Sequence, residues 1–292
     1  MKACFVILHY ITINDTINCV KSIHDTVDYD DYSIVIVDNG SPNQTGAELE
    51  KLYKDTPDVH VILQKENLGF AKGNNIGYAY AKHEEHADLM IVINSDTIIK
   101  DRDFIHKIIK SHENNHFSVL GPDIITPFDE HQNPFRNRML TKKQVKNRIR
   151  NKTIFWWYYN LKKKIKLFRK INLLENLFEK KSKNQRSGID SAVLQEGIVL
   201  QGAAVIYAAD YIRNEDSAFL PDTFMYGEED LLACRCAKKH YKMVYDPSIR
   251  ILHLYGGSTK KACKNTLDKN LFFTKYTLEG SKILLKKMNE TR

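Results

Sequence analysis

The chain has 292 residues, 42% of them hydrophobic and 27% charged, which excludes an intrinsically disordered protein and allows a sizeable core in one or two domains. Its net charge of +8 comes from one segment, 142–186, where 16 Lys/Arg accompany two acids, whereas the remainder holds 28 basic and 34 acidic residues. The five cysteines form no C-x-x-C pair, which excludes a zinc motif or a disulfide framework of the usual spacing.

Neither a targeting segment nor a membrane span is predicted. The first residues resemble a strand rather than a signal peptide, and no run of about 18 uncharged apolar residues occurs. We therefore expect a reduced, cytoplasmic protein, with the basic segment as a means of peripheral attachment to the inner face of the plasma membrane.

In chain order, short apolar runs alternate with helix-like segments over the first 126 residues. Strands are expected at 3–9, 32–37, 59–63, 89–93 and 118–125, and helices at 14–27, 45–55, 70–83 and 102–114. Continuous Val/Ile runs bounded by Asp, Asn and Gly, with helices between them, favour a parallel sheet covered on both faces.

The alternation stops at 127–190, where prolines and the basic tract intervene. After this interruption, a strand pair or strand-turn is expected at 198–207 and a helix at 229–240. A last strand is expected at 249–254, and a terminal helix at 266–288.

Three polar residues, Asp38, Asn67 and Asp96, each follow a predicted strand. Ligands of open α/β sheets bind outside the carboxyl ends of the strands, so the three residues indicate one crevice. A strand-end carboxylate such as Asp38 can accept a hydrogen bond from the N–H of uracil or thymine. The alternative for Asp38 is an Asx turn.

Residues 66–77, ENLGFAKGNNIG, predict a Gly/Asn-rich turn that begins a helix. Glycine permits close approach of the backbone to a ligand, the helix start offers free N–H groups, and Lys72 adds a positive charge for a diphosphate. The spacing is neither G-x-G-x-x-G nor that of a Walker loop, which excludes a dinucleotide site and a P-loop.

Acids elsewhere are candidates for catalysis. Asp96 follows a strand and can hold a divalent cation that bridges two phosphates, with a helix cap as the alternative. Glu228, Glu229 and Asp230 lie at a helix start, where the helix dipole explains part of their presence, and one of them could deprotonate an acceptor hydroxyl. His253 is a candidate second metal ligand, with a hydrogen-bonded core histidine as the alternative.

The order of these motifs resembles family 2 of the inverting glycosyltransferases, which have the GT-A fold, and the bacterial rhamnosyltransferase-like branch is the most similar. The matching segments are, in order, VDNGS, ENLGFAKGNNIG, NSD, QGAAVIY, FMYGEED and HLYGGS. They cover about 1–126 and 195–258. Each motif is weak alone, but six in order at sensible spacing are specific.

The resemblance implies a GT-A-type α/β fold, with a mostly parallel, Rossmann-like sheet flanked by helices and a basic helical insertion. By this resemblance, 1–126 is the nucleotide-sugar-binding half and 127–192 is the basic, aromatic, helical insertion. Residues 193–262 form the acceptor and catalytic half, and 263–292 form a C-terminal helix.

The resemblance also implies roles for single residues. Glu229 would be the catalytic base, with Asp230 kept as the alternative because the run of acids allows a slip of one residue. Asp96 and His253 would bind Mg²⁺ or Mn²⁺, while Asn94 stands where the family has an Asp. The donor-binding residues implied are Tyr10, Asp38, Asn39, Asn67, Gly69, Lys72, Asn94, Ser95, Gln201 and Gly202.

The activity implied is transfer of a hexosyl or rhamnosyl group from a UDP- or dTDP-sugar to a saccharide or lipid-linked saccharide, with inversion, in bacterial surface polysaccharide (cell wall or capsule) synthesis. A sugar-nucleotide pyrophosphorylase is excluded because no Gly-rich, basic loop follows the first strand. The remaining alternative is a non-catalytic membrane- or nucleic-acid-binding module on the same fold.

The basic segment begins with an aromatic run, 153–159, that holds both tryptophans, and apolar residues near helical spacing follow with Lys/Arg between them. Such a helix suits an anionic membrane surface and would give access to a lipid-linked acceptor. The alternative is packing of its apolar stripe on the protein body or on a second subunit, as in a homo-oligomer. No nucleic-acid partner is expected, because a recognised RNA- or DNA-binding motif is missing.

Overall fold

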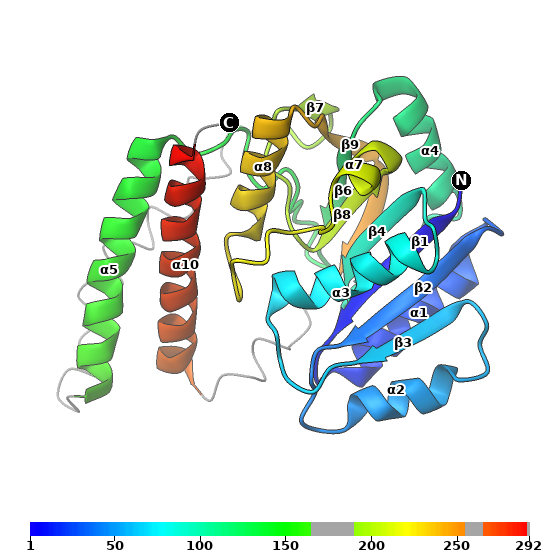
Figure 1. Ribbon diagram of the computed structural model, residues 1–292, viewed down its shortest axis with the longest axis horizontal. Coiled ribbons are helices and arrows are strands. Elements are labelled where there is room, and N and C mark those ends of the chain that lie inside the picture. The colour runs from blue at the N-terminus through cyan, green and yellow to red at the C-terminus, as the bar shows by residue number, and fades with distance from the viewer. Residues whose placement is uncertain (165–189, 255–264, 291–292) are drawn as a thin grey trace.

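The computed structural model describes residues 1–164, 190–254 and 265–290, which form an α/β fold around one sheet (Figure 1). The strand order is β3-β2-β1-β4-β8-β6-β9-β5, and β7 pairs with β9. The strands are β1 (Ala3–His9), β2 (Tyr32–Asp38), β3 (Val59–Leu63), β4 (Leu89–Asn94), β5 (Thr97–Ile98), β6 (Val119–Ile125), β7 (Gln195–Glu196), β8 (Ala204–Ala208) and β9 (Met243–His253).

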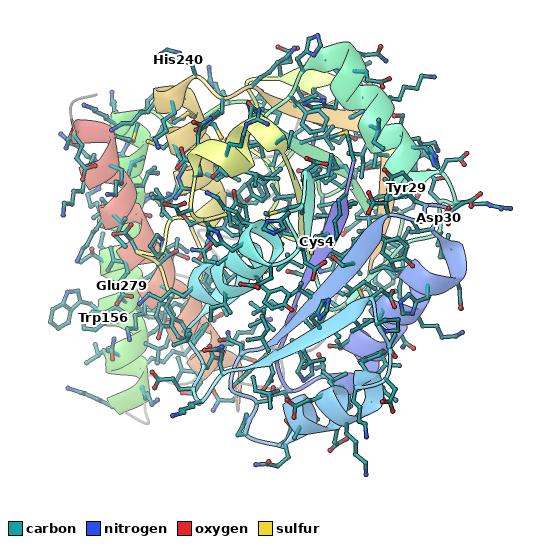
Figure 2. The ribbon with its side chains drawn as sticks, turned by 45° about the vertical axis from the view of Figure 1, so that its right-hand side comes forward. Cys4, Tyr29, Asp30, Trp156, His240 and Glu279 are labelled. Carbon is teal, nitrogen blue, oxygen red and sulfur yellow. The ribbon has the colours of Figure 1, made fainter. Side chains whose placement is uncertain are left out.

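The helices cover both faces of this sheet, as the sequence predicts. The sheet-covering helices are α1 (Ile13–Thr26), α2 (Thr45–Tyr53), α3 (Phe70–His83), α4 (Phe104–Asn115), α7 (Ala209–Asn214) and α8 (Glu228–Lys239). In β1, Phe5 and Ile7 pack with α1, α2 and α4, whereas Cys4 and Val6 pack with α3, α7 and α8. Alternate strand residues thus fill two apolar layers, and Figure 2 shows Cys4 within the sheet.

The first half of the sheet is parallel. Strand β1 pairs in parallel with β2 and with β4, and β2 pairs in parallel with β3. The register places His9 beside Asp38 and Leu8 beside Asn94, so the carboxyl ends of β1, β2 and β4 lie at one edge of the sheet. The prediction of parallel strands joined by helices is confirmed here.

The second half of the sheet departs from the parallel pattern. Strand β8 is antiparallel to both β4 and β6, and β5 and β7 are antiparallel to β9, so the sheet is mixed. Of the strand pair or strand-turn expected at 198–207, the structure has one strand, Ala204–Ala208, preceded by a turn at 202–203. The last strand is also longer than predicted, beginning at Met243.

Two long helices lie side by side beyond α8 (Figure 1), α5 (Lys142–Lys164) and α10 (Thr266–Asn289). Arg148 bonds to Ser281, whereas Lys163 near the end of α5 pairs with Asp268 near the start of α10, so the two helices are antiparallel. Val145, Leu231, Cys234 and Leu284 form an apolar cluster that joins the pair to α8. Part of α5 is therefore buried against the protein body, which was the alternative to membrane binding for the basic segment.

Several sequence-based expectations lie outside the described residues. They include the second part of the basic segment, 165–186, the end of the HLYGGS motif after Leu254, and Cys263. Cys4, Cys19, Cys234 and Cys236 are buried free thiols. Within the described ranges, no helix combines the length and the hydropathy needed to cross a bilayer.

Candidate active site

The predicted donor-binding residues cluster at the carboxyl edge of the parallel strands. Asp38 ends β2, and both its carboxylate oxygens accept the backbone N–H of Ser41 at 3.2 and 3.3 Å, which is the Asx-turn geometry. The His9 imidazole lies 3.9 Å from Asp38 and bonds to Thr16 and Thr45. Burial lowers the pKa of His9, which leaves the imidazole neutral at pH 7 beside the carboxylate.

The Gly/Asn-rich turn is held to the end of β2 by amide side chains. Asn39 donates to Asn67 Oδ1 and to the Gly69 carbonyl, both at 3.1 Å, and its own Oδ1 accepts the Leu68 N–H at 2.9 Å. Asn67 Oδ1 also accepts the Gly69 N–H at 2.9 Å. Asn39 is only 3% exposed, so the hydrogen bonds of its side chain to the turn are buried.

The same turn touches the segment that leads into α8. The Phe70 N–H donates to the Phe224 carbonyl at 2.7 Å. Gly69 has φ +84°, and a Cβ on it would lie 2.2 Å from the Phe224 oxygen, so only glycine permits this approach. The donor turn and the acid triplet at the start of α8 are thus neighbours, although about 150 residues separate them in sequence.

The candidate base, Glu229, lies near Gly202 at the end of β4. The Asn94 N–H donates to the Ala203 carbonyl at 2.9 Å, which holds the 201–203 turn at this strand end. A Cβ on Gly202 would lie 3.5 Å from Glu229 Oε1 and 3.7 Å from the Phe70 ring. Glu229, Gly202 and the donor turn are therefore neighbours at the carboxyl ends of the strands, where the sequence predicts the crevice.

Asp96 and His253 meet at the edge of the same region. Thr97 is in register with His253 in the β5–β9 ladder, and Asp96 Oδ1 lies 3.2 Å from His253 Nε2. His253 Nδ1 bonds to Gln132 Oε1 at 2.7 Å. Because an amide oxygen only accepts, Nδ1 carries a proton, and in neutral imidazole the Nε2 lone pair then faces Asp96. Asp96 Oδ1 and His253 Nε2 are thus an oxygen and a nitrogen close enough to share a divalent cation.

The three acids at the start of α8 have different environments. Glu228 is 3% exposed, and burial, with Glu229 second, raises its pKa to about 7. Asp230 is also buried, and its two oxygens accept from Arg136 and, at 2.8 Å, from Arg148. Glu229 is half-exposed between them. Glu229 therefore differs from both neighbours, because it is the least buried of the three and its carboxylate lies near Gly202.

Two predicted donor-binding residues stand apart from this set of contacts. Tyr10 follows β1 and is half-buried, and Lys72 is exposed in the first turn of α3. Within the described ranges, neither side chain bonds to the residues that link the crevice. Ser95 is 9% exposed and lies between Asn94 and Asp96, and the Gln201 side chain accepts the Ala203 N–H at 2.7 Å, shaping the turn at Gly202.

The comparisons with known proteins decide the family. The family model described as glycosyl transferase family 2 matches residues 4–176, more than half of the chain. The chain belongs to glycosyltransferase family 2. The matched range covers the parallel half of the sheet and α5, whereas α8, β9 and the candidate base lie beyond it.

Curated relatives of this glycosyltransferase match over shorter segments. It is 26% identical over 120 residues to the low-salt glycan biosynthesis hexosyltransferase Agl10 of Haloferax volcanii. This alignment covers 41% of this chain and 36% of the relative. It is 32% identical over 104 residues to the dTDP-rhamnosyl transferase RfbF of Shigella flexneri. This alignment covers 36% of this chain and 33% of the relative. The aligned segment thus spans about a third of each relative's length.

A solved structure shares the fold of this glycosyltransferase. GalNAc-T7, in a crystal with UDP, GalNAc and Mn²⁺, superposes with a TM-score of 0.59 at 12% identity, covering 87% of this chain and 44% of that one. Together with the largely parallel sheet and its flanking helices, this likeness shows a fold of GT-A type. The predicted fold class and the predicted family are confirmed.

Sequence analysis missed three residues that the glycosyltransferase places at its crevice. Gln132, Arg136 and Arg148 all fall in 127–192, which was assigned to a separate insertion. In the structure, His131 makes an isolated bridge to Ile125 at the end of β6, and Arg136 makes another to Val199, so this loop lies against the body of the protein. The sequence gave no signal for Gln132, because it lies in a polar loop without periodicity. Arg148 could not be distinguished, because it is one of nine Lys/Arg in α5.

The buried Asp230 pairing generates a stability prediction. We expect Arg136→Met to lower the free energy of unfolding by about 3 kcal/mol, because it removes one cation from a buried carboxylate. Urea unfolding followed by circular dichroism measures the change. Arg138→Met, an exposed arginine two residues away, is the control and should change stability by less than about 0.5 kcal/mol. Equal stability of both variants would contradict the proposed role of the pair.

Proposed function

We propose that the protein is a metal-dependent, inverting glycosyltransferase that uses a UDP- or dTDP-sugar, with Glu229 as the base. The single observation that carries this proposal is the proximity of Glu229 to Gly202: a Cβ built on Gly202 would lie 3.5 Å from Glu229 Oε1, so a carboxylate lies near the end of β4 and the donor turn. The family membership supports the reaction class. Asp38 retains further lone pairs for a base N–H, because its two bonds to Ser41 are long.

Glu229 is a better base than Asp230 on geometric grounds. Both oxygens of Asp230 are engaged by guanidinium groups in a buried position, which leaves no access for an acceptor hydroxyl. Glu229 faces the crevice, where it takes the proton of the acceptor hydroxyl as that oxygen forms the bond to the anomeric carbon. The bond from the sugar to the diphosphate breaks in the same displacement, and a single displacement inverts the anomeric configuration.

Asp96 and His253 fit a divalent cation. Two ligands about 2.1 Å from an octahedral metal ion lie about 3 Å apart, close to the 3.2 Å between Asp96 Oδ1 and His253 Nε2. Asp96 and His253 would supply two of its ligands, with diphosphate oxygens and water as the others. Mg²⁺ or Mn²⁺ would neutralise charge on the departing diphosphate. The Mn²⁺ in the GalNAc-T7 crystal supports this choice.

The acceptor assigned is a saccharide or lipid-linked saccharide in bacterial surface polysaccharide synthesis. The support is the similarity to a dTDP-rhamnosyl transferase and to a glycan-synthesis hexosyltransferase. The proposed organisation joins a donor half, 1–126, to a catalytic half, 193–262. The insertion, 127–192, and the tail, 263–292, act together, since α5 and α10 pack as a pair.

Substitution of the base tests the activity directly. Glu229→Gln should lower nucleotide release from a UDP- or dTDP-sugar by about 10²–10⁴-fold, because the amide cannot accept the proton. The rate is measured by coupled detection of the nucleoside diphosphate across a panel of nucleotide sugars. Asp222→Asn, an exposed acid seven residues earlier, is the matched control and should keep the wild-type rate. Wild-type turnover by Glu229→Gln would exclude this residue as the base.

Gln132 provides a test of the metal site. Gln132→Leu should weaken Mn²⁺ binding about 10–100-fold, because His253 loses the partner that orients its Nε2 toward Asp96. Electron paramagnetic resonance of free Mn²⁺ gives the dissociation constant without turnover. Gln144→Leu, an exposed change in the first turn of α5, should leave it unaltered. Equal Mn²⁺ affinity in both variants would remove His253 from the proposed site.

We also propose that α5 rests on an anionic membrane surface. Ile154, Trp157 and Leu161 are 52%, 66% and 45% exposed, and their spacing places them on one side of the helix. The helix carries nine Lys/Arg and no acid, which gives charge complementarity to anionic lipid. The neighbouring Trp156 lies at the outer edge of the helix pair, away from the sheet (Figure 2).

Vesicle co-sedimentation tests this surface. Trp157→Ser should weaken binding to phosphatidylglycerol vesicles about tenfold, because about 1.4 kcal/mol of interfacial burial is lost. Leu52→Ser, which removes a 53% exposed leucine from α2, is the control and should not change binding. Wild-type protein that stays in the supernatant, or that elutes as a dimer with Trp157 covered, would contradict membrane binding.

A further inference from the structure

Two cations of α5 face its neighbouring helices: Arg148 contacts both α8 and α10, and Lys152 contacts α10. Arg148 and Lys152 are four residues apart and so lie on the same side of the helix. Arg148 donates to Asp230 of α8 and, through Nε, to Ser281 of α10, both at 2.8 Å. The Lys152 ammonium lies 4.1 Å from the centre of the Phe273 ring of α10.

Arg136, Arg148 and Lys152 are three cations in this region, and the acids that act on the two arginines are Asp230 and Glu229. Arg136 and Arg148 share one carboxylate, that of Asp230. In the part of the chain that the structure describes, Lys152 pairs with no carboxylate, and its contacts are an aromatic ring and the field of Arg148. Burial, with Arg148 second, lowers the pKa of Lys152 to about 8. A half-buried cation held this way is unfavourable unless an anion completes its surroundings.

Arg148 has N–H donors that no acceptor in the described ranges uses. A guanidinium has five N–H donors, and the bonds of Arg148 to Asp230 and Ser281 use two of them. Lys152 adds an ammonium one helical turn away. A guanidinium and an ammonium side by side are the donors that bind a phosphate group well. A role in packing alone would not require a charge at Lys152, since an apolar side chain fills the same space without desolvation cost.

We propose that Arg148 and Lys152 bind a phosphate group of the acceptor, so that the sugar is transferred to a phosphate-bearing saccharide. The inference rests on the proposed function, because it assigns the phosphate to the acceptor whose hydroxyl meets Glu229. Arg148 bonds to Asp230, the residue after Glu229 in α8, so its guanidinium lies near the start of the helix that carries the base. The donor diphosphate is assigned to other residues, the turn at Asn67 and Asp96.

Calorimetric titration with inorganic pyrophosphate, in metal-free buffer with a chelator, tests the site without donor or turnover. We expect the wild type to bind pyrophosphate and Lys152→Met to bind it about tenfold more weakly. Lys146→Met, an exposed lysine on the same helix, should match the wild type. Arg148 stays unchanged in both variants because its bond to Asp230 supports the fold. Binding that is absent, or equal in all three proteins, would overturn the proposal.

A second measurement reports on the ammonium itself. In protein labelled with [ε-¹³C]lysine, the Lys152 resonance, assigned with Lys152→Arg, should titrate near pH 8 and shift to a higher pKa when pyrophosphate is bound, because an anion favours the charged form. A purely structural lysine would show no shift. Because neither measurement involves the donor, their failure is distinguishable from failure of the transferase reaction in the nucleotide-release assay.

Competition identifies the source of the phosphate. Saturating UDP should leave pyrophosphate binding at Lys152 intact if the site belongs to the acceptor, whereas displacement by UDP would assign it to the donor and overturn the proposal. Phosphatidylglycerol vesicles form the third arm. If vesicles displace pyrophosphate and Lys152→Met loses vesicle binding, the anion is a lipid headgroup, and the acceptor assignment is wrong.

Discussion

The hydrogen bond from the Phe70 N–H to the Phe224 carbonyl joins the two parts of the crevice. It ties the donor turn, which begins α3, to the segment that begins α8, and it forms only because Gly69 has no Cβ to strike Phe224. The proposed site depends on this contact, because it joins the donor turn to the segment that leads to Glu229. The two sides of the reaction are thus positioned by backbone rather than by flexible side chains.

The acid triplet shows how three adjacent carboxylates take different roles. Glu228 is buried with a raised pKa, Asp230 is fixed by two guanidinium groups, and Glu229 faces the crevice. Arg136 and Arg148 hold α8 against the rest of the molecule, and Arg148 also reaches α10. The helix pair therefore does more than cover α8, because it brings positive charge to the start of α8, where we propose that the acceptor binds.

The sequence was most informative where structure is local. Apolar runs predicted β1 and β3 to the residue and α3 likewise, because buried parallel strands and glycine-marked helix starts leave clear patterns. The antiparallel insertion of β8 was not predictable, since a strand of this composition fits either direction. Gln132 and Arg148 were missed because their roles arise from a returning loop and a helix packing on α8, neither of which leaves a periodic trace.

The account depends most on the convergence of Asp96, His253 and Glu229 on one bound donor. A crystal structure with a UDP-sugar or dTDP-sugar and Mn²⁺, with the metal located by its anomalous scattering, tests this directly. The account predicts Mn²⁺ on the Asp96 carboxylate and His253 Nε2, the diphosphate along the turn at Asn67, and the Glu229 carboxylate facing the anomeric carbon. A metal bound elsewhere, with Asp96 and His253 still paired and Glu229 remote from the sugar, would contradict it.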